Sequence, residues 1–105
     1  MILFMHPYVA NGRATAAIDI SNLENIRVAF AFCSPKDQFS RKKGRLIAEG
    51  RLRAGVTHIE FAADPDIPIK AQVMNELAED YVAGLYYFPN WANKGNYLSP
   101  LVGRL

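Results

Sequence analysis

The segment Ile26–Cys33, with the sequence IRVAFAFC, constrains the fold of this 105-residue chain more than any other part of the sequence. Successive side chains of a β-strand point to opposite faces of a sheet, so the alternation divides this segment into two faces. One face carries Ile26, Val28, Phe30 and Phe32, and the other carries Arg27, Ala29, Ala31 and Cys33. The second face is small and mostly apolar, which is typical of a central strand covered on both sides. The segment therefore predicts a sheet with further structure packed on each face.

Other segments predict the rest of this sheet. Residues 1–9 are a predicted strand that ends at Asn11-Gly12, a turn pair able to open a hairpin into residues 15–20. Residues 57–62 alternate as a strand, and residues 84–88 form a possible last strand. Together these segments predict a sheet of about four or five strands.

A first helix is predicted over residues 35–53. Ser34 is a suitable N-cap, and Pro35 suits the first helical position, where its missing N–H has no cost. Asp37 places a carboxylate in the first turn, where the helix dipole favours negative charge.

A second helix is predicted over residues 66–82, with Asp66 as its cap. Apolar side chains recur along it at four-residue spacing, namely Ile69, Val73, Leu77 and Tyr81. The turn-rich tail of residues 89–105 is expected to be an ordered loop packed by Trp91 and Tyr97. Residues 1–105 are therefore expected to form a single α+β domain, since this length is sufficient to bury a core.

Composition excludes several classes of protein. The single cysteine excludes an internal disulfide and a zinc site built of cysteines alone. Neither a tight metal-binding spacing such as HExxH nor a glycine-rich phosphate loop is present, so we expect no metal and no cofactor. The apolar first ten residues are too short to span a bilayer and lack a positive n-region, so we expect a cytoplasmic protein without membrane contact.

Positive charge is concentrated in one stretch. Between Lys36 and Arg53 the chain holds seven of its twelve basic residues, opposed only by Asp37 and Glu49. Residues 54–80 reverse the sign, with one lysine against six carboxylates. Either the acidic segment packs beside the basic one and neutralises part of it, or the basic segment is a positive patch that attracts a partner.

The helical period assigns the basic segment to faces. At ~100° per residue, the face that docks on the sheet is predicted to consist of Phe39, Leu46, Ile47 and Gly50. The opposite, solvated face would carry Arg41, Lys42 and Arg45, with Glu49 placed to pair with Arg45.

Lys43 and Gly44 fit this division poorly. Lys43 falls on the face expected to be buried, so either it snorkels along the apolar surface or it points into a groove beside Gly44 or Gly50. Gly44 costs ~1 kcal/mol relative to alanine inside a helix, which another interaction would have to offset.

The cations are the candidate binding residues. Phosphate groups of a nucleic acid, or an acidic protein surface, would be contacted by Arg41, Lys42, Lys43, Arg45, Arg51 and Arg53. Unpaired bases could stack on Tyr8, Tyr86, Tyr87 and Trp91. No helix-turn-helix, zinc-finger or ribonucleoprotein motif is present, so this expectation depends on charge. A solvated charged face with no partner is the alternative.

A cysteine-dependent enzyme is a further alternative. Cys33 lies between a strand and a predicted helix N-terminus, with Lys36 nearby, and such a position is typical of reactive thiols. His6 or His58 could act as base, oriented by Glu60. No local catalytic signature surrounds Cys33, and a cysteine at a strand end is more often a small core residue, so we assign no catalytic residue.

Residues 34–52 carry a resemblance. The pattern S-P-K-D-x-F-S-R-K-K-G-R-x-I-A-x-G-R-L, about a fifth of the chain, resembles a segment of small uncharacterised phage and prophage accessory proteins. The resemblance implies a phage-encoded origin and a location in the bacterial host cell. Some phage proteins of this size inhibit host defence, including CRISPR systems.

The expected function is therefore that of a non-enzymatic phage or mobile-element accessory protein. It would bind nucleic acid or a nucleoprotein through the basic helix of residues 35–53. The alternatives are an anti-CRISPR-like, protein-binding inhibitor of a host defence enzyme that uses the basic or the acidic helix, and a small cysteine-dependent enzyme. Oligomeric state does not follow from the sequence.

Overall fold

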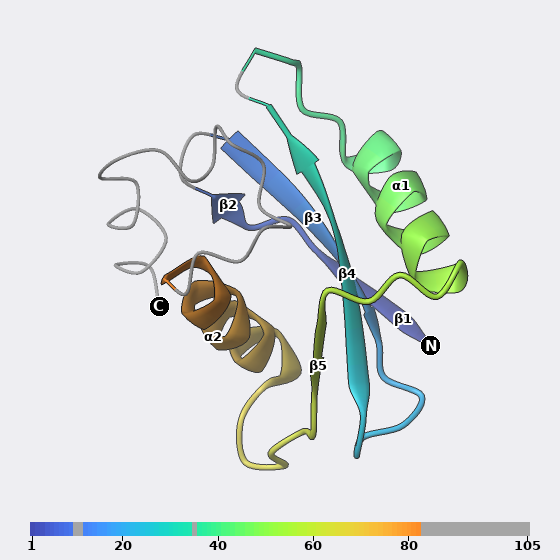
Figure 1. Ribbon diagram of the computed structural model, residues 1–105, viewed down its shortest axis with the longest axis vertical. Coiled ribbons are helices and arrows are strands. Elements are labelled where there is room, and N and C mark those ends of the chain that lie inside the picture. Colours follow the sequence, from blue (N-terminus) through green and yellow to red (C-terminus); the bar gives the residue numbers. More distant parts are fainter. Residues whose placement is uncertain (10–11, 35, 83–105) are drawn as a thin grey trace.

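Five strands and two helices build the protein, as the computed structural model shows for residues 1–9, 12–34 and 36–82 (Figure 1). The strands are β1 (Ile2–Met5), β2 (Tyr8–Val9), β3 (Gly12–Asp19), β4 (Ile26–Cys33) and β5 (Ile59–Phe61), and the helices are α1 (Arg41–Arg53) and α2 (Ile69–Val82). All strand pairs are antiparallel, in the order β1-β3-β4-β5, and β2 also pairs with β3. The expected α+β class and the size of the sheet are confirmed.

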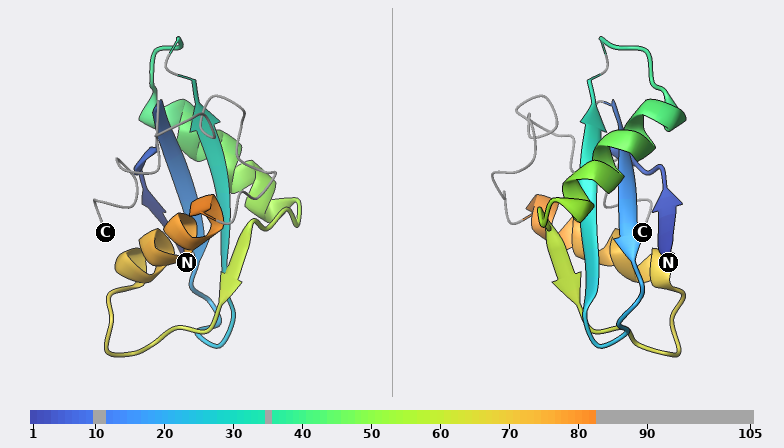
Figure 2. Two further views of the ribbon diagram at one scale, coloured as in Figure 1. Left: turned by 60° about the vertical axis from the view of Figure 1, so that its left-hand side comes forward. Right: turned by 90° about the vertical axis from the view of Figure 1, so that its right-hand side faces the viewer.

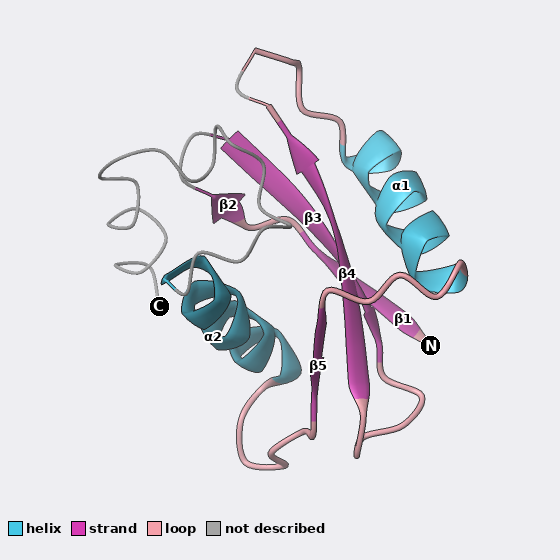
Figure 3. Cartoon of the chain, viewed as in Figure 1, coloured by secondary structure: helices cyan, strands magenta, loops and turns pink. Residues whose placement is uncertain are grey.

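The two helices cover opposite faces of the sheet (Figure 2). β3 and β4 form its centre, paired from Arg13 opposite Cys33 to Asp19 opposite Arg27. Figure 3 shows the resulting order of layers, with the strands between α1 and α2. The prediction that β4 is a central strand covered on both sides is confirmed.

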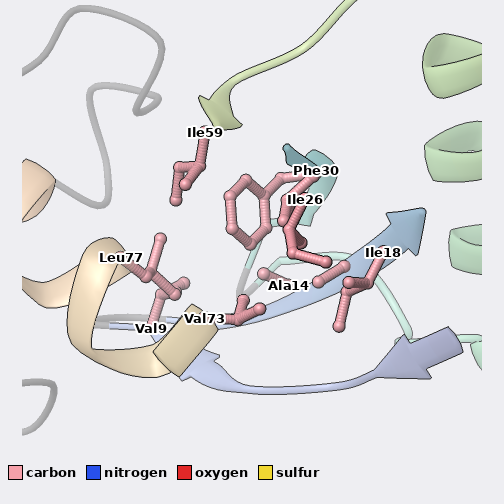
Figure 4. Close-up of a cluster of buried hydrophobic side chains, with 10 residues drawn as sticks. Val9, Ala14, Ile18, Ile26, Phe30, Ile59, Val73 and Leu77 are labelled. Atoms are coloured by element: carbon pink, nitrogen blue, oxygen red, sulfur yellow. The ribbon is translucent and has the colours of Figure 1, made fainter. Parts of the chain in front are cut away.

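The α2 side holds the larger core. Phe30 lies at its centre, fully buried, and packs among aliphatic side chains from four strands and α2 (Figure 4). These are Val9, Ala14, Ala16, Ile18, Ile26, Val28, Ile59, Val73 and Leu77. Burying apolar side chains of this size is the main stabilising contribution to a fold.

The α1 side is made of small residues. Ala17, Ala29 and Ala31 of the sheet pack against Ala48 and Leu52 of the helix. Short side chains let the helix approach the strands closely, so this layer is thin. The strand pattern predicted this difference between the two faces.

The first predicted strand is divided in two. His6 and Pro7 separate β1 from β2, and both pieces pair with β3. Proline has no backbone N–H to donate, so Pro7 can join the backbone hydrogen bonding only through its carbonyl. That carbonyl accepts a hydrogen bond from Ala14 N at 2.9 Å. The predicted hairpin is present as the β2–β3 pair, with Val9 opposite Gly12. Gly12 of the predicted turn pair is thus the first residue of β3, and residues 10 and 11 lie outside the described residues.

The predicted start of the basic helix is wrong. α1 begins at Arg41, and its N-cap is Ser40, whose Oγ accepts from Lys43 N at 3.2 Å. Ser34 belongs instead to a turn, because its carbonyl accepts from Asp37 N at 3.0 Å. Its hydroxyl accepts from Lys36 N at 3.2 Å. Asp37 therefore precedes the helix, and Pro35 lies outside the described residues.

The predicted docking face of α1 is also wrong. Leu46 is 68% exposed and Ile47 is 42% exposed, whereas Ala48 and Leu52 are buried. The alanine-lined sheet face therefore packs against the side of the helix that carries Ala48 and Leu52, and Leu46 and Ile47 lie on the exposed side.

α2 begins three residues later than the predicted boundary. The segment before it is held by Gln72, a buried side chain whose Oε1 accepts from Asp64 N at 2.8 Å. Gln72 Nε2 donates to the Asp64 and Ile67 carbonyls, and Asp66 N is bonded to Asp64 Oδ1. The helix therefore starts at Ile69 rather than beside Asp66.

Several expectations fall on parts of the chain that the structure does not describe. They are the strand of residues 84–88 and the packing of Trp91 and Tyr97. The stacking aromatics Tyr86, Tyr87 and Trp91 lie there as well. Among the described helices, neither is long and apolar enough to cross a membrane.

Candidate functional site

The first half of α1 presents a group of exposed cations. They are Arg41, Lys42, Lys43 and Arg45. Within residues 1–9, 12–34 and 36–82, none of the four forms an ion pair with a carboxylate, because the two salt bridges there are Arg27–Asp19 and Arg53–Glu49. We call these four residues the basic surface.

The second half of α1 has intramolecular partners. Arg51 Nη1 donates to the Phe30 carbonyl at 2.7 Å, and Arg53 Nε donates to Glu49 at 2.7 Å. The prediction that Glu49 pairs with Arg45 is therefore wrong. The six candidate cations do not form one uniformly free surface, because the last two are held by the protein itself.

Arg51 and His58 together complete the edge of β4. β5 pairs with β4 from Phe61 opposite Ile26 to Ile59 opposite Val28, and the Phe30 peptide lies beyond the last of these pairs. Phe30 N donates to His58 Nδ1 at 2.9 Å, and Arg51 donates to the Phe30 carbonyl. The His58 ring also stacks on Phe30 at 5.9 Å between centroids. Burial, and then the charge of Arg51, lower the pKa of His58.

Arg45 is exposed, as predicted, and it also contacts the sheet. Its Nε donates to His6 Nε2 at 3.3 Å, and its guanidinium carbon lies 5.4 Å from the centre of the Phe4 ring. The adjacent Gly44 makes this possible, because a Cβ at that position would collide with the Thr15 side chain. α1 therefore passes close to β3 at this point.

The arrangement determines which nitrogen of His6 carries the proton. Arginine can only donate, so Nε2 of His6 accepts, and Nδ1–H donates to Thr15 Oγ1 at 3.1 Å. The neutral imidazole is favoured for a second reason. Burial, followed by Arg45, Arg41, Arg13 and Lys70, lowers the pKa of His6.

Arg13, which the sequence did not single out, lies beside His6. Its guanidinium carbon is 4.1 Å from the centre of the Tyr8 ring and 4.3 Å from that of Phe39, so the cation stacks on both rings. Nη2 donates to the His6 carbonyl at 3.1 Å, while Nε is buried without a hydrogen-bond partner. Phe39 is 26 positions away in sequence, so no local pattern could have indicated this stack.

A groove of about 480 Å³ lies beside the start of α1. Its walls come from the ends of β3 and β4, from residues 37–40 and from Lys43, Gly44 and Ile47 of the helix. Lys43 is exposed and lines this groove together with Gly44, whereas Gly50 is not among the lining residues. A second hollow of about 430 Å³ adjoins it and is lined by Lys42, Lys43 and Leu46 among others.

The residues proposed for a cysteine-dependent catalytic site are not hydrogen-bonded to one another. Cys33 lines the groove, and its Sγ lies 3.7 Å from each of the Ser34 and Asp37 carbonyls. Of its proposed bases, His6 is bonded to Thr15 and Arg45, and His58 to Phe30. Glu60 accepts from Asn25 at 3.2 Å. In the described ranges, no three His, Cys, Asp or Glu side chains are grouped to hold a metal ion.

The acidic helix does not lie beside the basic one. α2 covers the other face of the sheet (Figure 2), so the three carboxylates that it contributes to the acidic segment of residues 54–80 do not lie beside α1. Three carboxylates lie close together on α2, namely Glu76, Glu79 and Asp80. Burial, and then the charges of Glu79 and Asp80, raise the pKa of Glu76. The molecule therefore carries opposite charge on its two helical layers.

Comparison with known proteins identifies no relative. No protein-family model, curated protein or solved structure matches the chain. The functional argument therefore depends on the geometry and charge of the site.

Proposed function

We propose that this is a non-enzymatic protein that binds the phosphate backbone of a nucleic acid, alone or within a nucleoprotein, through the basic surface of α1. One observation carries the proposal. The four cations of the basic surface are exposed and without carboxylate partners in the described chain, while the acidic helix lies on the opposite layer. Such a separation produces a local positive field that attracts polyanions.

The proposal narrows the set of contacts. Arg51 and Arg53 are held by the Phe30 carbonyl and by Glu49, so the phosphate contacts are assigned to Arg41, Lys42 and Lys43. Arg45, whose Nε donates to His6, would contribute its remaining N–H groups. The phage or mobile-element origin suggested by residues 34–52, and a location in the host cytoplasm, stay predictions.

The test is the salt dependence of oligonucleotide binding. Binding of labelled single-stranded and duplex DNA and RNA would be followed by fluorescence anisotropy at several salt concentrations. Four phosphate contacts predict a slope of log affinity against log salt of about −3 to −4. Absent binding, or binding insensitive to salt, would contradict the proposal.

Charge-matched variants locate the contact. Lys42→Gln with Lys43→Gln should weaken binding and flatten the salt slope by about 2. Arg53→Gln, on the same helix but paired with Glu49, should have a smaller effect per charge removed. Glu79→Gln on α2 should change affinity little at physiological salt, where charges are screened beyond ~8 Å. Effects that are equal per unit of charge, with Glu79→Gln strengthening binding as much as Arg53→Gln weakens it, would show non-specific attraction to net charge rather than a defined surface.

A second candidate function is binding of an acidic protein, such as a host defence enzyme that the chain would inhibit. It is favoured by Leu46 and Ile47, which are 68% and 42% exposed beside the cations. Apolar side chains in the middle of a charged patch are typical of protein interfaces. Leu46→Ser with Ile47→Ser should remove a protein complex recovered after nuclease treatment and leave oligonucleotide affinity unchanged. The opposite pattern would exclude the protein partner.

A further inference from the structure

Three arginines from two elements gather around His6 at the end of β1. Arg13 donates to the His6 carbonyl, and Arg45 donates to its imidazole. Arg41 lies one helical turn before Arg45, on the same side of α1. We propose that Arg13, Arg41 and Arg45, here the arginine cluster, form a site for one phosphate group. The inference rests on the proposed function, since it identifies where the nucleic acid would be held most tightly.

The charge of the cluster is not balanced by a carboxylate of the described residues. Throughout the described residues, none of the three arginines pairs with a carboxylate. Bringing like charges together costs free energy, and a bound anion would offset that cost. The positive charge of the cluster also acts on His6. The pKa of this side chain is lowered by burial and then by all three arginines, together with Lys70 at the start of α2.

Arg13 supplies an orphaned donor. Its Nε is buried and has no acceptor, although a buried unpaired N–H is unfavourable. Stacking on Tyr8 and Phe39 holds the guanidinium plane, while Nη2 donates to the His6 carbonyl. The cation is therefore oriented before any ligand arrives.

The donor chemistry selects the anion. Guanidinium groups present paired N–H donors that match the oxygens of phosphate. A site with several such groups would bind a multivalent oxyanion such as phosphate more tightly than it would bind a single carboxylate. The matching source is a phosphate of a nucleic acid, either within the strand or at its 5′ end. Lys42 and Lys43 lie between Arg41 and Arg45 in the sequence, so neighbouring phosphates would contact these two lysines.

Nuclear magnetic resonance of the full-length protein tests the site directly. The probe is inorganic phosphate, titrated at constant ionic strength against chloride. The Arg13 Nε–H signal should shift, and the pKa of His6 should rise toward its ordinary value as the anion offsets the arginines. His58 is the internal control, because its pKa should not move. Equal effects of chloride, or equal shifts at the two histidines, would overturn the site.

Variants provide a second measurement. Arg41→Gln should weaken phosphate binding about tenfold, the effect of one charge-assisted hydrogen bond. Arg53→Gln removes the same charge from the same helix and should leave phosphate affinity unchanged. Circular dichroism would establish that each variant is folded. An Arg41→Gln protein that is folded and binds phosphate as tightly as the parent would overturn the role of Arg41.

Oligonucleotides separate this inference from the proposed function. Thymidine oligomers with and without a 5′-phosphate distinguish an end phosphate from an internal one. Loss of oligonucleotide binding in Lys42→Gln/Lys43→Gln, but not in Arg41→Gln or Arg45→Gln, would reject the arginine cluster and keep the proposed function. Response of His6 and Arg13 to phosphate, with no oligonucleotide binding, would keep the site and reject the proposed function.

Discussion

Gly44 is the residue that connects the packing of α1 to the candidate site. A side chain there would collide with Thr15, which is fully buried and bonded through Oγ1 to His6. The close approach therefore brings Arg45 to His6 as well as docking the helix. It also explains a glycine inside a helix, where its intrinsic cost had to be offset by something outside the local sequence.

Substitution of the two helical glycines should have opposite effects. Gly44→Ala should destabilise the fold by roughly 1–3 kcal/mol, because the buried, β-branched Thr15 cannot move aside easily. Gly50→Ala meets nothing within 4 Å and should stabilise it by up to ~1 kcal/mol. Urea denaturation measures both. Two variants of equal stability would contradict the close contact.

At the scale of the element, α1 differs from its sequence-based prediction in its start and in its docking face. Ser34 and Ser40 are both acceptable caps, so local propensity could not choose between them. Two contacts place the cap at Ser40 rather than at Ser34. They are the turn at Ser34–Asp37 and the packing of Phe39 on Arg13 and His6. The face could not be predicted either, because it depends on how small the opposing sheet residues are.

Removal of each serine hydroxyl tests the helix start. Ser40→Ala should lower the free energy of unfolding by about 0.5–2 kcal/mol, since Lys43 N loses its acceptor at the helix terminus. Ser34→Ala, in an exposed turn, should cost less than half as much. Thermal denaturation of the two variants gives the comparison, and a larger loss for Ser34→Ala would place the cap where the sequence alone suggested it.

At the scale of the whole molecule, stability should fall as pH is lowered from 7 to 5. The folded-state pKa values of His6 and His58 lie below the ordinary value of 6.5, so the unfolded chain binds more protons as pH drops through that value. Stability is then fully present above about 6.5 and is lost below it. Glu76 has a raised pKa and acts in the opposite direction. Asp19, held at a pKa of about 2 by hydrogen bonds from Ser21, titrates below this range.

The contribution of His58 can be isolated. His58→Asn retains an acceptor for the Phe30 N–H but cannot be protonated in this range. Its unfolding free energy, measured in urea at pH 7 and pH 5, should change less than that of the parent protein. An identical change in both proteins would show that His58 contributes nothing to the pH dependence.

The sequence by itself determined the α+β class, the two-sided central strand β4 and the existence of two helices. These properties depend on the alternation and helical period of neighbouring residues, which are local. Only the tertiary structure decided where α1 begins, which of its sides docks, and that Arg51 and Arg53 are held by Phe30 and Glu49. It also decided that α2 lies on the opposite layer and that Arg13, Arg41 and Arg45 surround His6. Those features join residues far apart in the chain, so their energies depend on contacts that no local pattern encodes.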